Sequence, residues 1–162
     1  MRLLDILFII NKMKPELKRK QNLILKKLRS VYGIKALDNF ELDGIGKRLI
    51  GSNFCGVYAY DQYPIHKEDC TYAIINTDNS RQSGTHWISV YKKDKTLYIF
   101  DSFGRFSKNV LKKFVKSHIA EGYKIVDVNR TSDQGNNQQD CGLRCITTLL
   151  LTKKYGINAV FD

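Results

Sequence analysis

Two short runs rich in β-branched and aromatic residues, positions 86–92 and 95–101, are separated by only Lys93-Asp94. A connection this short joins antiparallel strands, so the sequence predicts a β-hairpin. A two-residue turn at that point places His86 directly opposite Asp101. Two apolar pairs then share the same face of the sheet: Ile88 with Ile99 and Val90 with Leu97. The hairpin therefore predicts a buried sheet face that ends in an imidazole beside a carboxylate.

The rest of the chain supplies helices and further strands around this hairpin. At 162 residues it is long enough for one hydrophobic core but short for two. Strand-like runs cover residues 70–76 and 123–129, helical patterns cover 39–48, 107–121 and 140–155, and loops cover 51–56, 77–84 and 131–140. The last helix is apolar on most sides and should be buried. We therefore expect an α+β fold in which a small central mixed or antiparallel sheet packs against helices.

The first 35 residues form a predicted basic amphipathic helical arm, followed by the main domain over residues 36–162. Apolar residues recur at helical spacing among lysines, and Gly33 is a candidate stop signal. These apolar positions are Leu17, Ile24, Leu28 and Val31. Such an arm either packs on the core or contacts DNA or a membrane surface, and the sequence leaves both open. The apolar run at residues 3–10 is too short to span a bilayer and has no cleavage site behind it, so we expect a soluble, intracellular protein.

The 27 lysines and arginines outnumber the 16 acidic residues and give a formal net charge of +11. A charge of this sign favours nucleic acid or another anionic surface as a partner. It is equally compatible with a solvated basic surface, and it carries no information about catalysis.

Cysteine usage bears on both metal binding and redox state. The four cysteines are Cys55, Cys70, Cys141 and Cys145, and no two of them form a CxxC pair. His66 and Cys70 have i, i+4 spacing, as do Cys141 and Cys145, but the flanking sequence of a zinc motif is absent. We therefore expect free thiols and no metal site, as in a protein from a reducing compartment.

Cys141 stands where the last predicted helix begins. A helix N-terminus favours a thiolate, because its unpaired N–H groups and its dipole stabilise negative charge. Gly142 next to it would leave room for a substrate backbone. A base for this thiol must be an imidazole oriented by a carboxylate, as His86 and Asp101 would be. Taken separately, each feature has a structural alternative, namely a core cysteine and a cross-strand ion pair.

An acyl-transfer site also needs donors for an oxyanion, and a side-chain amide often supplies one. Five amide side chains crowd the loop before the candidate nucleophile: Gln134, Asn136, Asn137, Gln138 and Gln139. Physical reasoning alone does not choose among them, since an amide-rich loop is also ordinary surface.

The order His, acid, Gln, Cys and the strings around these residues resemble the adenovirus-type maturation cysteine proteases, the adenain family, and more distantly the SUMO-deconjugating proteases. The matching strings lie at residues 73–77, 84–87, 97–104, 134–135 and 141–143, with a further likeness at 56–61. The resemblance implies an adenain-like fold. The sequence departs from the family at Asp101, which replaces a Glu, and in residues 120–130, which contain no cysteine to bind an activating peptide. The first 35 residues have no recognised counterpart.

The resemblance implies a role for each site residue. Cys141 would be the nucleophile, His86 the general base and later the acid, and Asp101 the group that orients His86. Gln134, seven positions before Cys141, would donate to the oxyanion. The substrate-binding positions implied with them are Trp87, as the wall of a narrow cleft, Gly84 and Gly142.

The implied function is that of a viral cysteine endopeptidase that cleaves capsid and core precursor proteins during virion maturation, beside small residues such as glycine. The resemblance requires no small-molecule cofactor and suggests double-stranded DNA as an activator. It implies a protein of the virion and of the host-cell cytoplasm or nucleus. Two alternatives stay open: a ubiquitin- or SUMO-like deconjugating protease with the same four residues, and a basic nucleic-acid-binding protein with an inactive protease fold.

Overall fold

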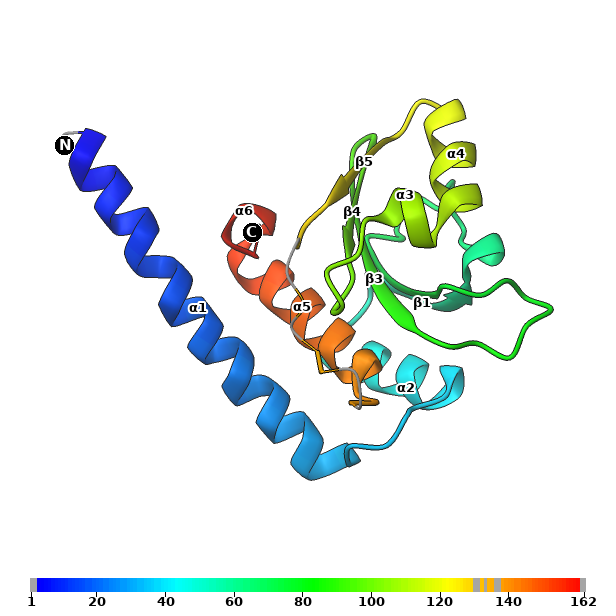
Figure 1. Cartoon of the computed structure of the whole chain (residues 1–162), viewed down its shortest axis with the longest axis horizontal. Coiled ribbons are helices and arrows are strands. Elements are labelled where there is room, and N and C mark those ends of the chain that lie inside the picture. Colours follow the sequence, from blue (N-terminus) through cyan, green and yellow to red (C-terminus); the bar gives the residue numbers. More distant parts are fainter. Residues whose placement is uncertain (1–2, 130–131, 133, 136–137, 161–162) are drawn as a thin grey trace.

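A five-stranded mixed sheet forms the centre of the computed structural model, which describes residues 3–129, 132, 134–135 and 138–160, with side chains from Pro15 onward. The strands are β1 (Phe54–Ala59), β2 (Tyr72–Asn76), β3 (Trp87–Lys93), β4 (Thr96–Phe100) and β5 (Lys124–Asp127), and they lie side by side in chain order. The pairs β2–β3 and β3–β4 are antiparallel, whereas β1 and β5 run parallel to their neighbours. The predicted α+β fold with a small mixed sheet is confirmed (Figure 1).

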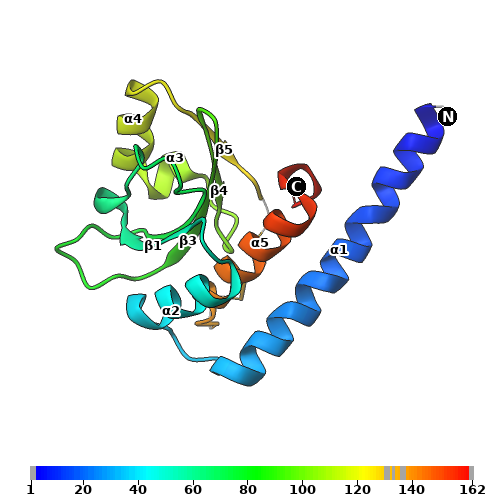
Figure 2. The ribbon, with the colours of Figure 1, turned by 180° about the vertical axis from the view of Figure 1, so that it is seen from behind.

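Helices cover both faces of the sheet. They are α1 (Leu3–Tyr32), α2 (Asn39–Leu49), the 3-10 turn η1 (Tyr60–Gln62), α3 (Ser107–Val110), α4 (Lys112–Ala120), α5 (Cys141–Tyr155) and α6 (Ile157–Val160). The helices α2 and α5 lie on one face and α3 and α4 on the other, while α1 runs along the outer side of α5 (Figures 1 and 2). Each face therefore has its own core, one built around Leu143, Ile146 and Leu149 of α5 and the other around Phe114 of α4.

The β3–β4 hairpin is present, but its predicted register is wrong. The turn lies at Asp94-Lys95 rather than Lys93-Asp94, so Val90 pairs with Ile99. Asp94 adopts a positive φ of 52°, a conformation that Asp tolerates better than Lys. When the turn moves by one position, the cross-strand partner of each residue moves by two positions along the other strand. Because side chains alternate between the two faces of a strand, each side chain stays on its predicted face of the sheet. The four apolar residues of the predicted face accordingly share one core: Ile88, Val90, Leu97 and Ile99.

Two further elements differ from the sequence prediction. The segment 51–56 was expected to be a loop, but Phe54–Gly56 belong to β1, whose hydrogen bonds come from a distant partner, β2. The helix expected over 107–121 is broken at Leu111, where φ is −130° and ψ is 44°. The helices α2 and α5 and the loop at 77–84 lie where they were predicted.

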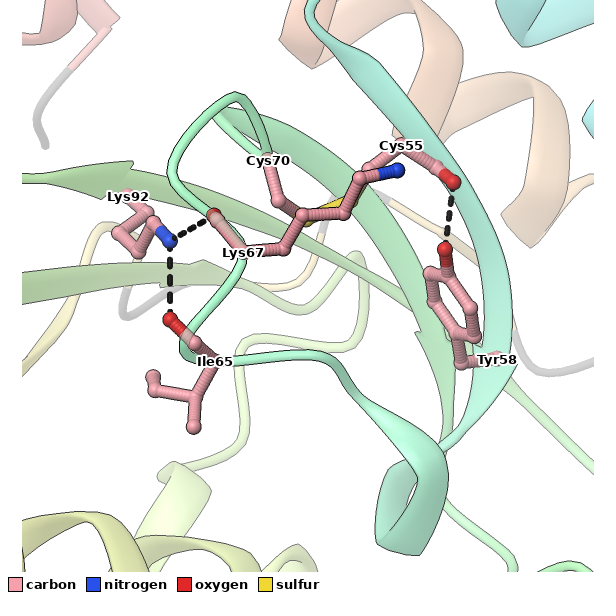
Figure 3. Close-up of a disulfide and its surroundings, with 6 residues drawn as sticks. All are labelled: Cys55, Tyr58, Ile65, Lys67, Cys70 and Lys92. Atoms are coloured by element: carbon pink, nitrogen blue, oxygen red, sulfur yellow. Dashed lines mark hydrogen bonds between the residues drawn. A yellow bond between two sulfur atoms is a disulfide. The ribbon is translucent and has the colours of Figure 1, made fainter.

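The expectation of four free thiols is wrong for Cys55 and Cys70, which form a disulfide (Figure 3). Because β1 and β2 are parallel neighbours with Phe54 opposite Tyr72, Cys55 in β1 comes close to Cys70 just before β2, at a Cα–Cα distance of 4.9 Å. The sequence could not show this pairing, since it did not predict β1. Cys141 and Cys145 are free, as expected.

The loop between η1 and β2 is also tied to the sheet (Figure 3). The ammonium group of Lys92 donates to the carbonyl oxygens of Ile65 at 2.9 Å and Lys67 at 2.7 Å. The Tyr58 hydroxyl donates to the carbonyl oxygen of Cys55. The Lys92 contacts hold this loop against β3, whereas the Tyr58 contact lies within β1.

The second half of α1 packs on the core of the α5 face. Leu25 and Leu28 are buried there, and Ile24 is half-buried, whereas Val31 is 64% exposed, contrary to the predicted apolar stripe. The arm therefore has the packing role that the sequence left open, and the boundary at residue 35 stays a prediction. Among the described helices, none combines the length and the apolar character needed to cross a bilayer.

Candidate active site

His86 and Asp101 meet at one end of the sheet. His86 precedes β3 and Asp101 follows β4, and both side chains are buried, with exposed fractions of 5% and 2%. His86 Nε2 lies 2.7 Å from Asp101 Oδ1. The shifted register makes them diagonal neighbours rather than direct partners, and the ring of Phe103 lies against the imidazole, with ring centroids 4.6 Å apart.

The Asp101 carboxylate is fixed by donors on both oxygens. Oδ1 also accepts from the N–H of Phe103 at 2.9 Å, and Oδ2 accepts from Arg105 Nε at 2.8 Å. The side chain of Asn129 binds both the N–H and the carbonyl oxygen of Asp101, which fixes its backbone. Burial opposes ionisation, but the donors from His86, Phe103 and Arg105 outweigh it and hold the pKa of Asp101 below its usual value. Asp101 is therefore a charged, oriented acceptor for His86.

Cys141 is the first residue of α5 and lies beside the same imidazole. Burial alone would lower the pKa of His86, but hydrogen bonds with Asp101 and with the Cys141 thiol outweigh it and raise that pKa above its usual value. Because Asp101 occupies Nε2, Nδ1 is the nitrogen left to exchange a proton with the thiol. The structure thus brings together three of the predicted site residues.

A pocket of about 340 Å³ opens beside Cys141. Its walls come from residues 36–39, the end of β1 and the loop that follows β2. Trp87 lines it, and its indole N–H donates to the carbonyl oxygen of Leu37 at 3.0 Å, which fixes the ring. The candidate nucleophile and the fixed indole ring of Trp87 therefore line the same pocket.

Gly84 also lines this pocket and has a φ of +83°, where side chains are disfavoured. A Cβ there would lie 3.0 Å from Asn76 Nδ2. Asn76 in turn holds the loop, since its Oδ1 accepts from the N–H groups of Asp78 at 2.9 Å and Thr85 at 3.2 Å. The part of Gly84 and Trp87 in substrate binding stays a prediction.

Gly142 lies in close contact with α2. A Cβ at this position would lie 2.6 Å from a methyl carbon of Leu42. The missing side chain therefore allows α5 to approach α2 closely. The part of Gly142 in substrate binding stays a prediction.

The family model described as adenovirus endoprotease matches residues 54–161, which is more than half of the chain. The chain belongs to the adenovirus endoprotease family. The resemblance inferred from the sequence is thereby confirmed.

Two relatives are proteases of adenoviruses. The protease of Bovine adenovirus 2 is 30% identical over 93 residues, which cover 50% of this chain and 45% of that protein. The protease of Bovine adenovirus B serotype 3 is 28% identical over 127 residues, which cover 68% of this chain and 61% of that protein. The chain thus spans about half of the length of these relatives. The family match begins at residue 54 and leaves α1 and α2 outside it.

Gln134 lies next to the strand end that carries Asp101. Its backbone N–H donates to the carbonyl oxygen of Ser102 at 3.1 Å, and its side-chain Oε1 accepts from the Ser102 hydroxyl at 2.5 Å. Its Nε2 donates to the carbonyl oxygen of Gln138 at 2.5 Å, which leaves the second N–H of the amide for another acceptor. Gln134 is thus a fixed amide, and its oxyanion role stays a prediction.

The other amides of the loop have different surroundings. The side-chain oxygen of Gln138 accepts from the N–H of Gly135 and from Arg144, so it is engaged away from the pocket, whereas Gln139 lines the pocket. Asn136 and Asn137 lie outside the described residues. Within the described part of the chain, no cluster of three His, Cys, Asp or Glu side chains is placed to hold a metal ion.

Several residues of the site were not identified from the sequence. Asn129, Ser102 and Arg105 fix the predicted residues through the hydrogen bonds described above. Arg105 lies in the irregular turn after β4, and the contacts of Asn129 and Ser102 join segments far apart in the chain, so no sequence pattern indicated these contacts.

Proposed function

We propose that the protein is a cysteine endopeptidase with Cys141 as nucleophile, His86 as base and acid, and Asp101 as the group that orients His86. The observation that carries the proposal is the buried imidazole in contact with both a carboxylate and the thiol at the start of α5. Membership of the adenovirus endoprotease family supports it.

In the proposed reaction the imidazole takes the proton of Cys141 as Sγ attacks the carbonyl carbon of the scissile peptide bond. The resulting imidazolium then gives this proton to the leaving amine, the C–N bond breaks, and an acyl thioester remains on Cys141. A water molecule, deprotonated by His86, attacks the thioester and releases the carboxylic acid and the thiol. Asp101 stays ionised throughout, because its task is to stabilise the imidazolium.

Negative charge on the carbonyl oxygen requires hydrogen-bond donors. The N–H groups of the first turn of α5 have no partner within the helix, so the N–H of Cys141 is one candidate donor. The second N–H of the Gln134 amide is the other. Gln134 lies on a segment that the hydrogen bonds described above hold in place.

The proposed substrates are capsid and core precursors of a virus, cleaved beside small residues. The support is the adenoviral origin of the relatives, together with the pocket beside Cys141 that Trp87 and Gly84 line. Binding to double-stranded DNA is a further proposal that rests on the net charge of +11 alone. Cleavage of ubiquitin or SUMO conjugates in place of precursors would favour a deconjugating protease instead.

Labelling with a peptide vinyl sulfone tests the proposal directly. We expect one equivalent to attach to Cys141, because His86 can deprotonate its thiol. Cys145 provides an internal control on the same helix, since burial raises the pKa of its thiol well above the usual value and keeps it unreactive. Peptide mapping by mass spectrometry gives the modified residue. A folded protein that reacts at neither cysteine, or at both equally, would contradict the proposal and favour the inactive alternative.

The oxyanion role of Gln134 predicts a specific kinetic signature. Gln134→Ala should lower kcat by about 10²-fold or more with little change in KM, because the donor acts where negative charge develops in the transition state. The matched control is Gln139→Ala, which removes a pocket-lining amide. Steady-state kinetics on a precursor peptide separate the two. A kcat loss in Gln139→Ala without one in Gln134→Ala would transfer the role to Gln139.

A further inference from the structure

The helix α1 reaches the nucleophile segment through Arg29. The guanidinium group donates from Nε to Asp140 Oδ2 at 2.7 Å, and Nη2 donates to the same oxygen. Asp140 directly precedes Cys141, and its side chain is only 3% exposed. A residue of the N-terminal arm is thus in contact with the residue adjacent to the proposed nucleophile.

From Asp140 a series of hydrogen bonds continues to the proposed oxyanion donor. Asp140 Oδ1 accepts from Arg144 Nε at 3.0 Å, and Arg144 Nη2 donates to the Gln138 side-chain oxygen at 2.9 Å. The backbone carbonyl of Gln138 accepts from the Gln134 amide. Both residues that would handle the scissile carbonyl, Cys141 and Gln134, are therefore connected to one buried carboxylate.

The charge of this carboxylate matters to the thiol. Burial disfavours ionisation, but the hydrogen bonds from Arg144 and Arg29 outweigh it and hold the pKa of Asp140 below its usual value. An uncompensated negative charge beside Cys141 would disfavour the thiolate. The two arginines offset that charge, and Arg29 is the one that comes from outside the region matched by the family model.

We propose that Arg29 is a positioning residue of the active site: it orients and neutralises Asp140, and through it sets the geometry of Cys141 and Gln134. This inference rests on the proposed function, since it concerns the efficiency of the same reaction. In this proposal, α1 contributes to the rate of the reaction through Arg29, in addition to packing on the core. The competing account is that Arg29 only fastens α1 to the body of the protein.

The test uses the full chain with Arg29→Ala and a matched control, Arg48→Ala. Arg48 also ties α1 to its surroundings, because its Nη1 donates to the Tyr32 hydroxyl at 3.0 Å, but this exposed contact joins α1 to α2 and not to the nucleophile segment. For Arg29→Ala we expect kcat to fall by about 10- to 100-fold with KM nearly unchanged, since small displacements of reacting groups have effects of this size. Arg48→Ala should keep the kcat of the parent protein.

Three further readouts separate positioning from anchoring. Added ethylguanidine should restore part of the kcat of Arg29→Ala, because it can occupy the vacated place beside Asp140. The acidic limb of the kcat/KM profile should move to higher pH, since the loss of the Arg29 cation leaves the negative charge of Asp140 less compensated beside the reacting groups. In an Asp140→Asn background, Arg29→Ala should cause little additional loss, because the two residues act through one contact.

The outcomes are distinct for the two proposals. Parent-like kcat and pH profile in a folded Arg29→Ala protein would overturn the positioning role and leave the proposed function intact. If Arg29→Ala does not fold, Arg29→Lys decides between the two accounts. Lysine keeps the positive charge but cannot donate to Asp140 from two nitrogens as Arg29 does. A positioning role therefore predicts a lower kcat for Arg29→Lys, whereas a purely anchoring role predicts an unchanged kcat. Failure of the parent protein to react with the vinyl sulfone would instead remove the proposed function itself.

Discussion

Cys141→Ala and His86→Ala are each expected to abolish peptide cleavage. The reason is that the nucleophile and its base act as one unit, so that removal of either leaves no route to the thioester. The double variant should be no worse than either single variant. The measurement is the rate of precursor cleavage under conditions in which circular dichroism shows a folded chain.

The matched control for this pair is Cys145→Ala. Cys145 lies one turn further along α5, is fully buried, and has the other free thiol of the chain. Its truncation should leave kcat close to that of the parent and cost a small amount of stability through the cavity it creates. Substantial turnover by Cys141→Ala, or loss of turnover in a folded Cys145→Ala, would refute the assignment of the nucleophile.

The second large effect is expected for Asp101→Asn, which should lower kcat by roughly 10²- to 10⁴-fold. An amide cannot stabilise the imidazolium by charge, and it allows the wrong tautomer of His86 to form. Asp43→Asn is the matched control, because Asp43 is paired with Lys47 at the surface of α2, away from the site.

Asp101→Asn should also have a pH-dependent effect on stability. The folded-state pKa of Asp101 is lowered, so its ionisation stabilises the fold above the unfolded-state pKa, and this contribution is lost as the pH falls through the folded-state value. The difference in free energy of unfolding between parent and variant should therefore shrink on acidification. Urea titrations at several pH values measure it. A kcat loss that tracks the loss of folded protein would make Asp101 structural only.

The sequence predicted those parts of the site whose geometry is local. The start of α5 at Cys141 followed from a strong helical pattern, and the proximity of His86 and Asp101 followed from the hairpin. The register was wrong because the turn position depends on which residue adopts a positive φ, and Asp94 does so. Even so, the apolar residues of the hairpin lie on the predicted face of the sheet, because side chains alternate along a strand and the register differs by an even number of positions.

Features that depend on distant partners were not predictable in the same way. The strand β1 is defined by its parallel pairing with β2, so both it and the disulfide between Cys55 and Cys70 were missed. The contact of Arg29 with Asp140 joins positions that are 111 residues apart. A single sequence records that both residues are charged, but not that they meet.

That separation has a consequence for the synthesis of the protein. At a translation rate of roughly 5 to 20 residues per second, Asp140 leaves the ribosome about 5 to 20 seconds after Arg29. During this interval Leu25 and Leu28 of α1 have no α5 to pack against, so the nascent arm exposes apolar surface. His86 and Asp101 also emerge before Cys141, and this proposed nucleophile belongs to α5, the helix that completes one core. The proposed peptide-cleaving activity can therefore arise only after the segment that begins at Cys141 has been made, which protects neighbouring nascent chains from cleavage until then.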